Sequence, residues 1–283
     1  MVNSSTARSS VITLSLLCAS LFEAESFSIT SPRGIRSTHD VHTNLQMAAI
    51  SETNPRLEGL AFDLDDGTRK SHSVAQNSSF VSGFFRGLST REAYSKLLTS
   101  LYFVYTAMED TFDSTLDDMV KKMDNSELRR VEALSVDMEY FYGAGWEKVI
   151  TPSRAAKKYA DRVLEVGRDQ PKLLIAHQYT RYLGDLFGGQ MMGGMATRSL
   201  NLEDGNGVAF YTFDDINSPK DFITTWYQKL NELDLTAKER QEIVDEANYV
   251  FELNIEILEE LEGSALKAAW TLAWKSFREK MSF

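Results

Sequence analysis

Apolar side chains recur at three- and four-residue steps along most of this chain, and that period constrains the fold more than any other feature. Between residues 94 and 108, six apolar residues fall on one face of a predicted helix: Tyr94, Leu97, Leu98, Leu101, Tyr105 and Met108. One helix is expected to begin at Thr151 as its N-cap, with Pro152 in the first turn. Residues 210–213, flanked by a glycine and a proline, are expected to form a loop or a small extended piece. The same pattern predicts further helices over residues 126–142, 152–167, 173–200, 220–233 and 236–261.

Length and composition fit one all-α domain. The chain has 283 residues, of which 43% are hydrophobic and 25% charged, so residues 51–283 are long enough to bury one ordinary core. The formal net charge of −11, without a large basic stripe, argues against nucleic acid as a partner. The one cysteine, Cys18, lies in a segment that we expect to be removed. Neither a disulfide nor a thiolate metal ligand is therefore expected.

The N-terminal segment has the composition of a targeting leader. Residues 1–27 contain one basic residue, Arg8, followed by an apolar run too short to span a bilayer, which is typical of a secretory signal. Residues 28–50 are rich in Ser and Thr and contain a single acid, Asp40, which is typical of a transit peptide. A signal followed by a transit segment is similar to the bipartite leaders of complex plastids, so we expect localisation in the plastid stroma. A plain disordered tail and secretion are the alternatives.

Five glycines interrupt the helical pattern over 173–200, at Gly184, Gly188, Gly189, Gly193 and Gly194. Each glycine inside a helix costs about 1 kcal/mol relative to alanine, so the run requires a compensating role. One such role is close approach of the backbone to a flat ligand, and the other is helix packing through the GxxxG step. Spacing alone leaves both open. Asp185, among apolar neighbours in the same run, must find a hydrogen-bond network or water.

Two histidines fall in the expected domain, His72 and His177. His72 lies four residues before Gln76, and that helical step brings the amide oxygen toward the imidazole Nδ1–H. Such a bond would fix the tautomer and leave Nε2 available to bind a metal. A solvent-exposed histidine without a ligand role is the alternative.

Four strings carry a family resemblance: GTRKSHSVAQN (67–77), LYFVYTAMED (101–110), AHQYTRYLGDLFGGQ (176–190) and IVDEANYVFELNIEILEELEG (243–263). In order and spacing they resemble haem oxygenases, particularly those of cyanobacteria and plastids, over roughly Leu57 to Leu261. The resemblance implies a single-domain, all-α haem oxygenase-like fold. In that fold haem lies between a helix bearing the iron ligand His72 and a glycine-rich helix containing Gly184 and Gly188.

The resemblance also implies roles for individual residues. Asp185, Gly184 and Tyr105 match catalytic positions, at which the aspartate orders water on the oxygen-binding side of haem. Arg181 matches a position near the same network, whereas His177 is expected to be structural. The positions expected to contact haem are His72, Arg69, Gln76, Tyr179, Thr180, Gly184, Gly188, Tyr227, Phe251 and Asn254.

The implied reaction cleaves haem at the α-meso carbon to biliverdin, carbon monoxide and ferrous iron. Haem is both substrate and cofactor, O2 is the oxidant, and electrons come from ferredoxin or an NADPH-linked reductase. A bilin reductase is a possible consumer of the product, and a monomer without a transmembrane anchor is expected. The amphipathic tail from about residue 264 is too charged to anchor the protein in a membrane.

Several positions depart from the family pattern. Asp65, Ile223 and Tyr227 stand where the family usually has basic residues that hold the haem propionates. Phe187 replaces a small serine, and Gly193 with Gly194 replaces a lysine pair that faces the electron donor. These departures leave two alternatives: a catalytically impaired haem-binding or regulatory relative, and a helical protein that keeps the fold for another purpose.

Overall fold

The computed structural model describes residues 54–78 and 90–262, and no strand occurs within those two ranges. The predicted all-α class is therefore confirmed. The predicted leader over 1–50 and the tail from about 264 lie outside the described residues. The α-helices are α2 (Gly59–Gln76), α4 (Arg91–Ser114), α5 (Asp118–Met123), α6 (Val131–Tyr142), α7 (Arg154–Asp169), α8 (Leu174–His177), α9 (Gln190–Ser199), α10 (Pro219–Asn231) and α11 (Ala237–Glu262).

Short helical segments connect the α-helices. The 3-10 segments are η1 (Pro55–Leu57), η2 (Ser126–Leu128), η3 (Trp146–Lys148), η4 (Pro171–Leu173) and η7 (Ala209–Tyr211). The two π-helical segments are η5 (Gln178–Leu183) and η6 (Asp185–Gly189). Together with α8 and α9, these π-helical segments make up the glycine-containing helix predicted over 173–200. Within residues 210–213, the first two belong to the 3-10 turn η7 and the last two to the loop after it, so no strand forms there.

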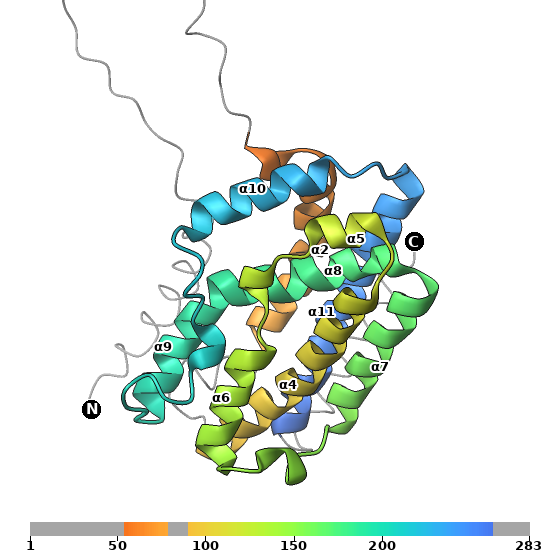
Figure 1. Cartoon of the computed structure of the whole chain (residues 1–283). Helices are drawn as coiled ribbons and strands as arrows, with labels where there is room; N and C mark the ends of the chain where they lie inside the picture. The colour runs from red at the N-terminus through yellow and green to blue at the C-terminus, as the bar shows by residue number, and fades with distance from the viewer. Residues whose placement is uncertain (1–53, 79–89, 263–283) are drawn as a thin grey trace, which may run out of the picture. The chain divides into compact units, whose positions relative to one another are not determined.

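Helix α4 lies at the centre of the core. Its predicted apolar face, from Tyr94 to Met108, is buried, and α7 and α11 pack against it. Figure 1 shows α4, α7 and α11 running side by side, with α10 across one end. Helix α11 also packs along α2 and contacts η5, so it lies against both parts of the chain expected to hold haem. Burial of these apolar faces is the main term that stabilises the fold.

Local sequence signals set the helix ends, in two cases differently from the prediction. The N-cap of α7 is Ser153, whose hydroxyl accepts a hydrogen bond from the Ala156 N–H, and not Thr151. Helix α6 begins at Val131 rather than at 126, because the chain before it forms the separate turn η2. Within residues 54–78 and 90–262, no helix is both long and apolar enough to cross a bilayer.

Candidate active site

The Asp185 carboxylate lies at the centre of a largely buried polar cluster. The Tyr105 phenol, from α4, donates a hydrogen bond to Asp185 Oδ2. Arg181 Nη2 lies 2.9 Å from Oδ2 and 3.2 Å from Oδ1 of the same carboxylate. Burial raises the pKa of Asp185 above its ordinary value, and the charge of Arg181 opposes that effect. The carboxylate is thereby fixed by a phenol and a guanidinium from two different elements.

A second bond of Arg181 extends this cluster to α11. Arg181 Nη1 donates to Asn254 Oδ1 at 2.7 Å, and Asn254 Nδ2 donates to the Val250 carbonyl at 2.8 Å. The asparagine is therefore oriented by its own helix. Side chains from α4, η5, η6 and α11 thus meet at one point, so the position of Asp185 depends on long-range packing as well as on its own helix.

The glycines divide into two groups by what surrounds them. A Cβ placed on Gly184 or Gly188 would meet no atom within 4 Å, and both residues are exposed. A Cβ on Gly189 would come within 3.0 Å of the Tyr211 ring, and one on Gly193 within 2.9 Å of Tyr211 Cβ. Gly189 and Gly193 therefore pack against η7, whereas Gly184 and Gly188 leave their backbone open to a ligand. The packing role therefore occurs at Gly189 and Gly193, whereas the ligand role at Gly184 and Gly188 stays a prediction.

π-Helical winding coincides with the open glycines. Gln178–Leu183 and Asp185–Gly189 both have π-helical hydrogen bonding, on either side of Gly184. Such winding widens a helix locally and is frequent at functional sites. Here the π-helical winding changes the position of Asp185 from the one it would have in a regular α-helix. The same segment contains Gly184 and Gly188, whose backbone is open.

His72 is an exposed imidazole in the last two turns of α2. Its ring contacts Phe251 of α11 edge-on, with centroids 6.0 Å apart. Neighbouring groups remove part of the water around the exposed ring, which lowers the pKa of His72 against the raising effect of Asp65, so the imidazole is neutral near pH 7. No group of three or more His, Cys, Asp or Glu in the described ranges could hold a metal ion. A metal at His72 would therefore need further ligands from a cofactor.

The comparison with known proteins decides the family. The family model described as Heme oxygenase matches residues 58–260. The chain belongs to the haem oxygenase family. It is 40% identical over 222 residues to heme oxygenase 1 of the cyanobacterium Nostoc sp., covering 78% of this chain and 93% of that protein. It is 42% identical over 209 residues to a heme oxygenase of Guillardia theta, covering 74% and 88%.

A solved structure of a haem oxygenase has the same fold. The crystal structure of heme oxygenase-1 from the cyanobacterium Synechocystis sp., in complex with heme, superposes with a TM-score of 0.71 at 41% identity. The superposition covers 78% of this chain and 100% of that chain. The predicted single-domain haem oxygenase-like fold is thereby confirmed.

The residues of this haem oxygenase family member fit a flat macrocycle. The open backbone at Gly184 and Gly188 can approach such a group closely, and the neutral imidazole of His72 could supply one nitrogen ligand. The Thr180 hydroxyl and the Gln178 amide are buried in the described residues without a protein hydrogen-bond partner. Polar atoms of this kind require water or a bound group.

The structure gives less direct support to the other residues that were expected to contact haem. No hydrogen bond joins His72 to Gln76, so the expected tautomer-fixing contact is absent between these two residues. Arg69 is exposed and lies 3.2 Å from Asp66, so its charge is turned toward acids of its own helix. Tyr227 is buried and Tyr179 is partly buried, and desolvation raises the pKa of Tyr179 to about 12.

His177 is structural, as expected. It is fully buried, and its Nε2 lies 3.1 Å from Glu246 Oε1. Burial lowers the pKa of His177, so the ring is neutral at pH 7 and donates to the carboxylate. Burial would raise the pKa of Glu246, but hydrogen bonds from His177 and Arg162 lower it to about 2. The hydrogen bonds of these three side chains connect α8, α7 and α11.

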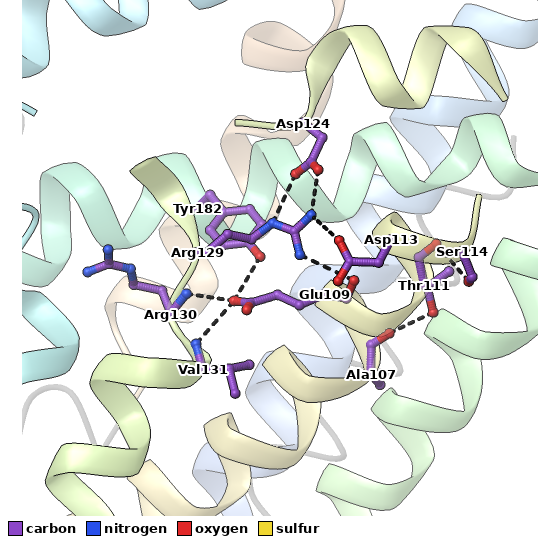
Figure 2. A network of polar contacts seen from close by, with 10 residues as sticks. All are labelled: Ala107, Glu109, Thr111, Asp113, Ser114, Asp124, Arg129, Arg130, Val131 and Tyr182. Carbon is purple, nitrogen blue, oxygen red and sulfur yellow. Dashed lines mark hydrogen bonds and ion pairs between the residues drawn. The ribbon is translucent and has the colours of Figure 1, made fainter. Parts of the chain in front are cut away.

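Sequence reasoning missed a partly buried carboxylate, that of Glu109, next to the Asp185 cluster. Figure 2 shows Glu109 accepting hydrogen bonds from the backbone amides of Arg130 at 2.6 Å and Val131 at 3.1 Å. The Tyr182 phenol lies 3.3 Å from the same oxygen, and its ring packs on that of Tyr105. The four-residue step from Tyr105 to Glu109 on one helix face was the available signal.

Proposed function

We propose that this protein is a haem oxygenase that binds haem through His72 and cleaves it at the α-meso carbon to biliverdin, carbon monoxide and ferrous iron. The observation that carries the proposal is the buried Asp185 carboxylate between two glycines, Gly184 and Gly188, whose backbone is open. Family membership and the resemblance to cyanobacterial haem oxygenases support it. When bound, haem supplies both the iron that binds O2 and the macrocycle that is oxidised.

The chain's own residues would bind haem and orient it. His72 offers a neutral nitrogen to the iron, and Phe251 restricts the rotation of its ring. The backbone at Gly184 and Gly188 carries no side chain and is open, so it would let haem approach this helix closely.

Asp185 is proposed to order water and to move a proton at its Oδ1. Tyr105 donates to Oδ2, and Arg181 contacts both oxygens, so the carboxylate keeps one orientation. Its pKa is raised by burial, which brings proton uptake closer to neutral pH. Tyr105 and Arg181 do not use every lone pair of this carboxylate, so it would still be able to accept a hydrogen bond from water.

The electron donor, product consumer and compartment are further proposals. Reduced ferredoxin is the preferred donor because the sequence resembles the cyanobacterial and plastid types, and an NADPH-linked reductase is the alternative. A plastid stromal location follows from the composition of residues 1–50, with a bilin reductase as the enzyme that takes the product. The protein is proposed to act as a monomer.

Turnover with defined donors tests the proposal. The full chain is incubated with haem, O2 and NADPH, and either ferredoxin with its reductase or a cytochrome P450 reductase. Biliverdin absorbance and carbon monoxide release are expected, at a higher rate with ferredoxin. A stable haem absorption band without biliverdin in either mixture would instead identify a catalytically impaired haem-binding relative. An unchanged spectrum of free haem would reject haem binding altogether.

A further inference from the structure

Arg130, the residue before α6, has a buried guanidinium whose hydrogen-bond partners are all carbonyls. The side chain is 7% exposed, and its Nη1 donates to the Thr212 carbonyl at 2.5 Å and to the Phe210 carbonyl at 3.4 Å. The carbonyls of residues 127 and 128 accept from Nη2 and Nε. Within residues 54–78 and 90–262 no carboxylate forms an ion pair with this guanidinium. Removing water from a cation that has no acid partner costs free energy, so the arrangement requires a compensating role.

Helix α6 and the residue before it bind the η7 turn at two points. Arg130 binds carbonyls of residues 210 and 212, whereas Asp137 accepts from the N–H groups of Ala209 and Phe210, each at 2.9 Å. Asp137 lies seven residues after Arg130, which is two helical turns, so both side chains project from one face. A cation therefore binds the carbonyls of this turn and an anion binds its amides.

The η7 turn contacts the Asp185 cluster through two aromatic rings. The Phe210 ring meets the Tyr105 ring edge-on, with centroids 5.5 Å apart, and Tyr105 is the phenol that donates to Asp185. The Tyr211 ring lies 3.0 Å from the place of a Cβ on Gly189, in the segment that carries Asp185. The position of η7 thus bears on both the donor and the acceptor of the bond between Tyr105 and Asp185.

The backbone of Arg130 is bound to the helix that carries Tyr105. Its N–H donates at 2.6 Å to the carboxylate of Glu109, which lies one turn after Tyr105 on α4. Figure 2 shows the Arg130 side chain pointing away from Glu109. Backbone and side chain of this one residue therefore bind α4 and η7, the two elements whose rings meet at Tyr105.

We propose that Arg130 is a positioning residue of the proposed reaction, which fixes η7 against α4 so that the Tyr105 phenol stays on Asp185. The inference rests on the proposed function. The hydrogen bonds of Asp185 in the described ranges come from Tyr105 and Arg181, so Arg130 acts through the phenol and not on the carboxylate directly. A hydrogen bond weakens steeply as its angle closes, and a small displacement of a ring can therefore lower turnover.

A double-mutant cycle with Tyr105→Phe tests this path. Biliverdin formation at saturating haem is measured for the full chain with ferredoxin, its reductase and NADPH. Arg130→Lys keeps the charge but loses the planar fork that reaches several carbonyls. It is expected to lower turnover about fivefold, and by no more than Tyr105→Phe does, with haem affinity within about threefold of the unmodified protein. In the Tyr105→Phe background it should lower turnover less than about twofold, because the hydroxyl that it positions is already absent.

A neighbouring arginine provides the matched control. Arg129→Lys makes the same chemical change at a guanidinium that is paired with Asp113 and Asp124, so turnover should change less than about twofold in either background. Thermal unfolding by circular dichroism shows which variants are folded. If Arg130→Lys does not fold, Asp137→Asn loosens the same turn from its amide side and should couple to Tyr105→Phe in the same way.

The outcomes separate this role from the proposed function. Turnover in the cycle is measured at pH 8, where Asp137 is ionised because its pKa is about 6. An equal loss of turnover with and without the Tyr105 hydroxyl would mean that Arg130 has a general structural role, and would overturn the inference. Full turnover by folded Arg130→Lys would overturn it as well, and both results leave the proposed function intact. No biliverdin from the unmodified chain would overturn both.

Discussion

The Tyr105 phenol donates a hydrogen bond to the Asp185 carboxylate, joining the central helix α4 to the π-helical part of the glycine-containing helix. Burial raises the pKa of Tyr105 well above its ordinary value, so the phenol remains a donor at every physiological pH. Arg181 contacts the same carboxylate and is tied to Asn254. The orientation of Asp185 is therefore determined by α4 and α11 as well as by its own segment.

Replacing Asp185 should separate haem binding from turnover. Asp185→Ala removes the proposed proton-handling group but not His72, so haem binding should persist while biliverdin formation falls by about a hundredfold or more. Tyr105→Phe keeps the carboxylate and loses one donor, so an intermediate loss is expected. The control Asp161→Ala removes a carboxylate from an exposed pair on α7. Rates of biliverdin formation provide the measurement, and full turnover by Asp185→Ala would remove this residue from the mechanism.

Substitution by alanine should have opposite effects on the free energy of unfolding at the two kinds of glycine. Gly184→Ala meets no neighbouring atom, so it should raise the free energy of unfolding by up to about 1 kcal/mol while weakening haem binding. Gly193→Ala brings a Cβ within 2.9 Å of Tyr211 Cβ, so it should lower that free energy by about 1–3 kcal/mol. Urea unfolding and haem titration measure the two effects. Destabilisation by Gly184→Ala would mean that its backbone is not open.

Much of the fold could be predicted from the sequence because helical periodicity is local. Every apolar position singled out on α4 is buried, and Ser153 displaces the predicted cap by only two residues. The contacts of Tyr211 with Gly189 and Gly193 could not be predicted, since they depend on how the loop after α9 folds back. The same holds for the hydrogen bonds of Glu109 with residues 130 and 131, which lie about twenty positions away.

The sequence predicted which residues belong to the candidate site more reliably than it predicted the contacts between them. Family strings identified Asp185, Tyr105 and Asn254, and the structure brings all three into one cluster through Arg181. The expected bond between His72 and Gln76 does not form, because a four-residue step gives proximity but nothing else holds these two side chains together. The charge change at Asp65 suggested a lost cation, whereas the structure pairs it with Arg56.

The His177–Glu246–Arg162 group should contribute to stability and not to chemistry. Glu246→Ala leaves a buried imidazole and a guanidinium without their shared acceptor, so the free energy of unfolding should fall by about 3 kcal/mol. Denaturant unfolding measures the loss. The haem spectrum of the folded protein should be unchanged, and a lost imidazole-bound spectrum at full stability would assign this group to the site instead.

Asp137 predicts a pH dependence of stability. Its buried carboxylate accepts bonds from the Ala209 and Phe210 amides, yet burial raises its pKa to about 6. A raised pKa means that the native state binds the proton more tightly than the unfolded state. The stabilisation is therefore complete below about pH 4 and is lost as pH rises through 6, by about 2–3 kcal/mol. Unfolding of Asp137→Asn across that range should lack this decline, and an identical pH profile would contradict the assignment.

The central claim is that His72 is the nitrogen ligand of haem iron, and the absorption spectrum of His72→Ala tests it most directly. Mixed with ferric haem, the unmodified protein should give an imidazole-ligated spectrum. His72→Ala should lack that spectrum and regain it when free imidazole is added, because the small molecule can occupy the space of the lost ring. An imidazole-ligated spectrum in His72→Ala without added imidazole would show that the iron is held elsewhere and would contradict the account.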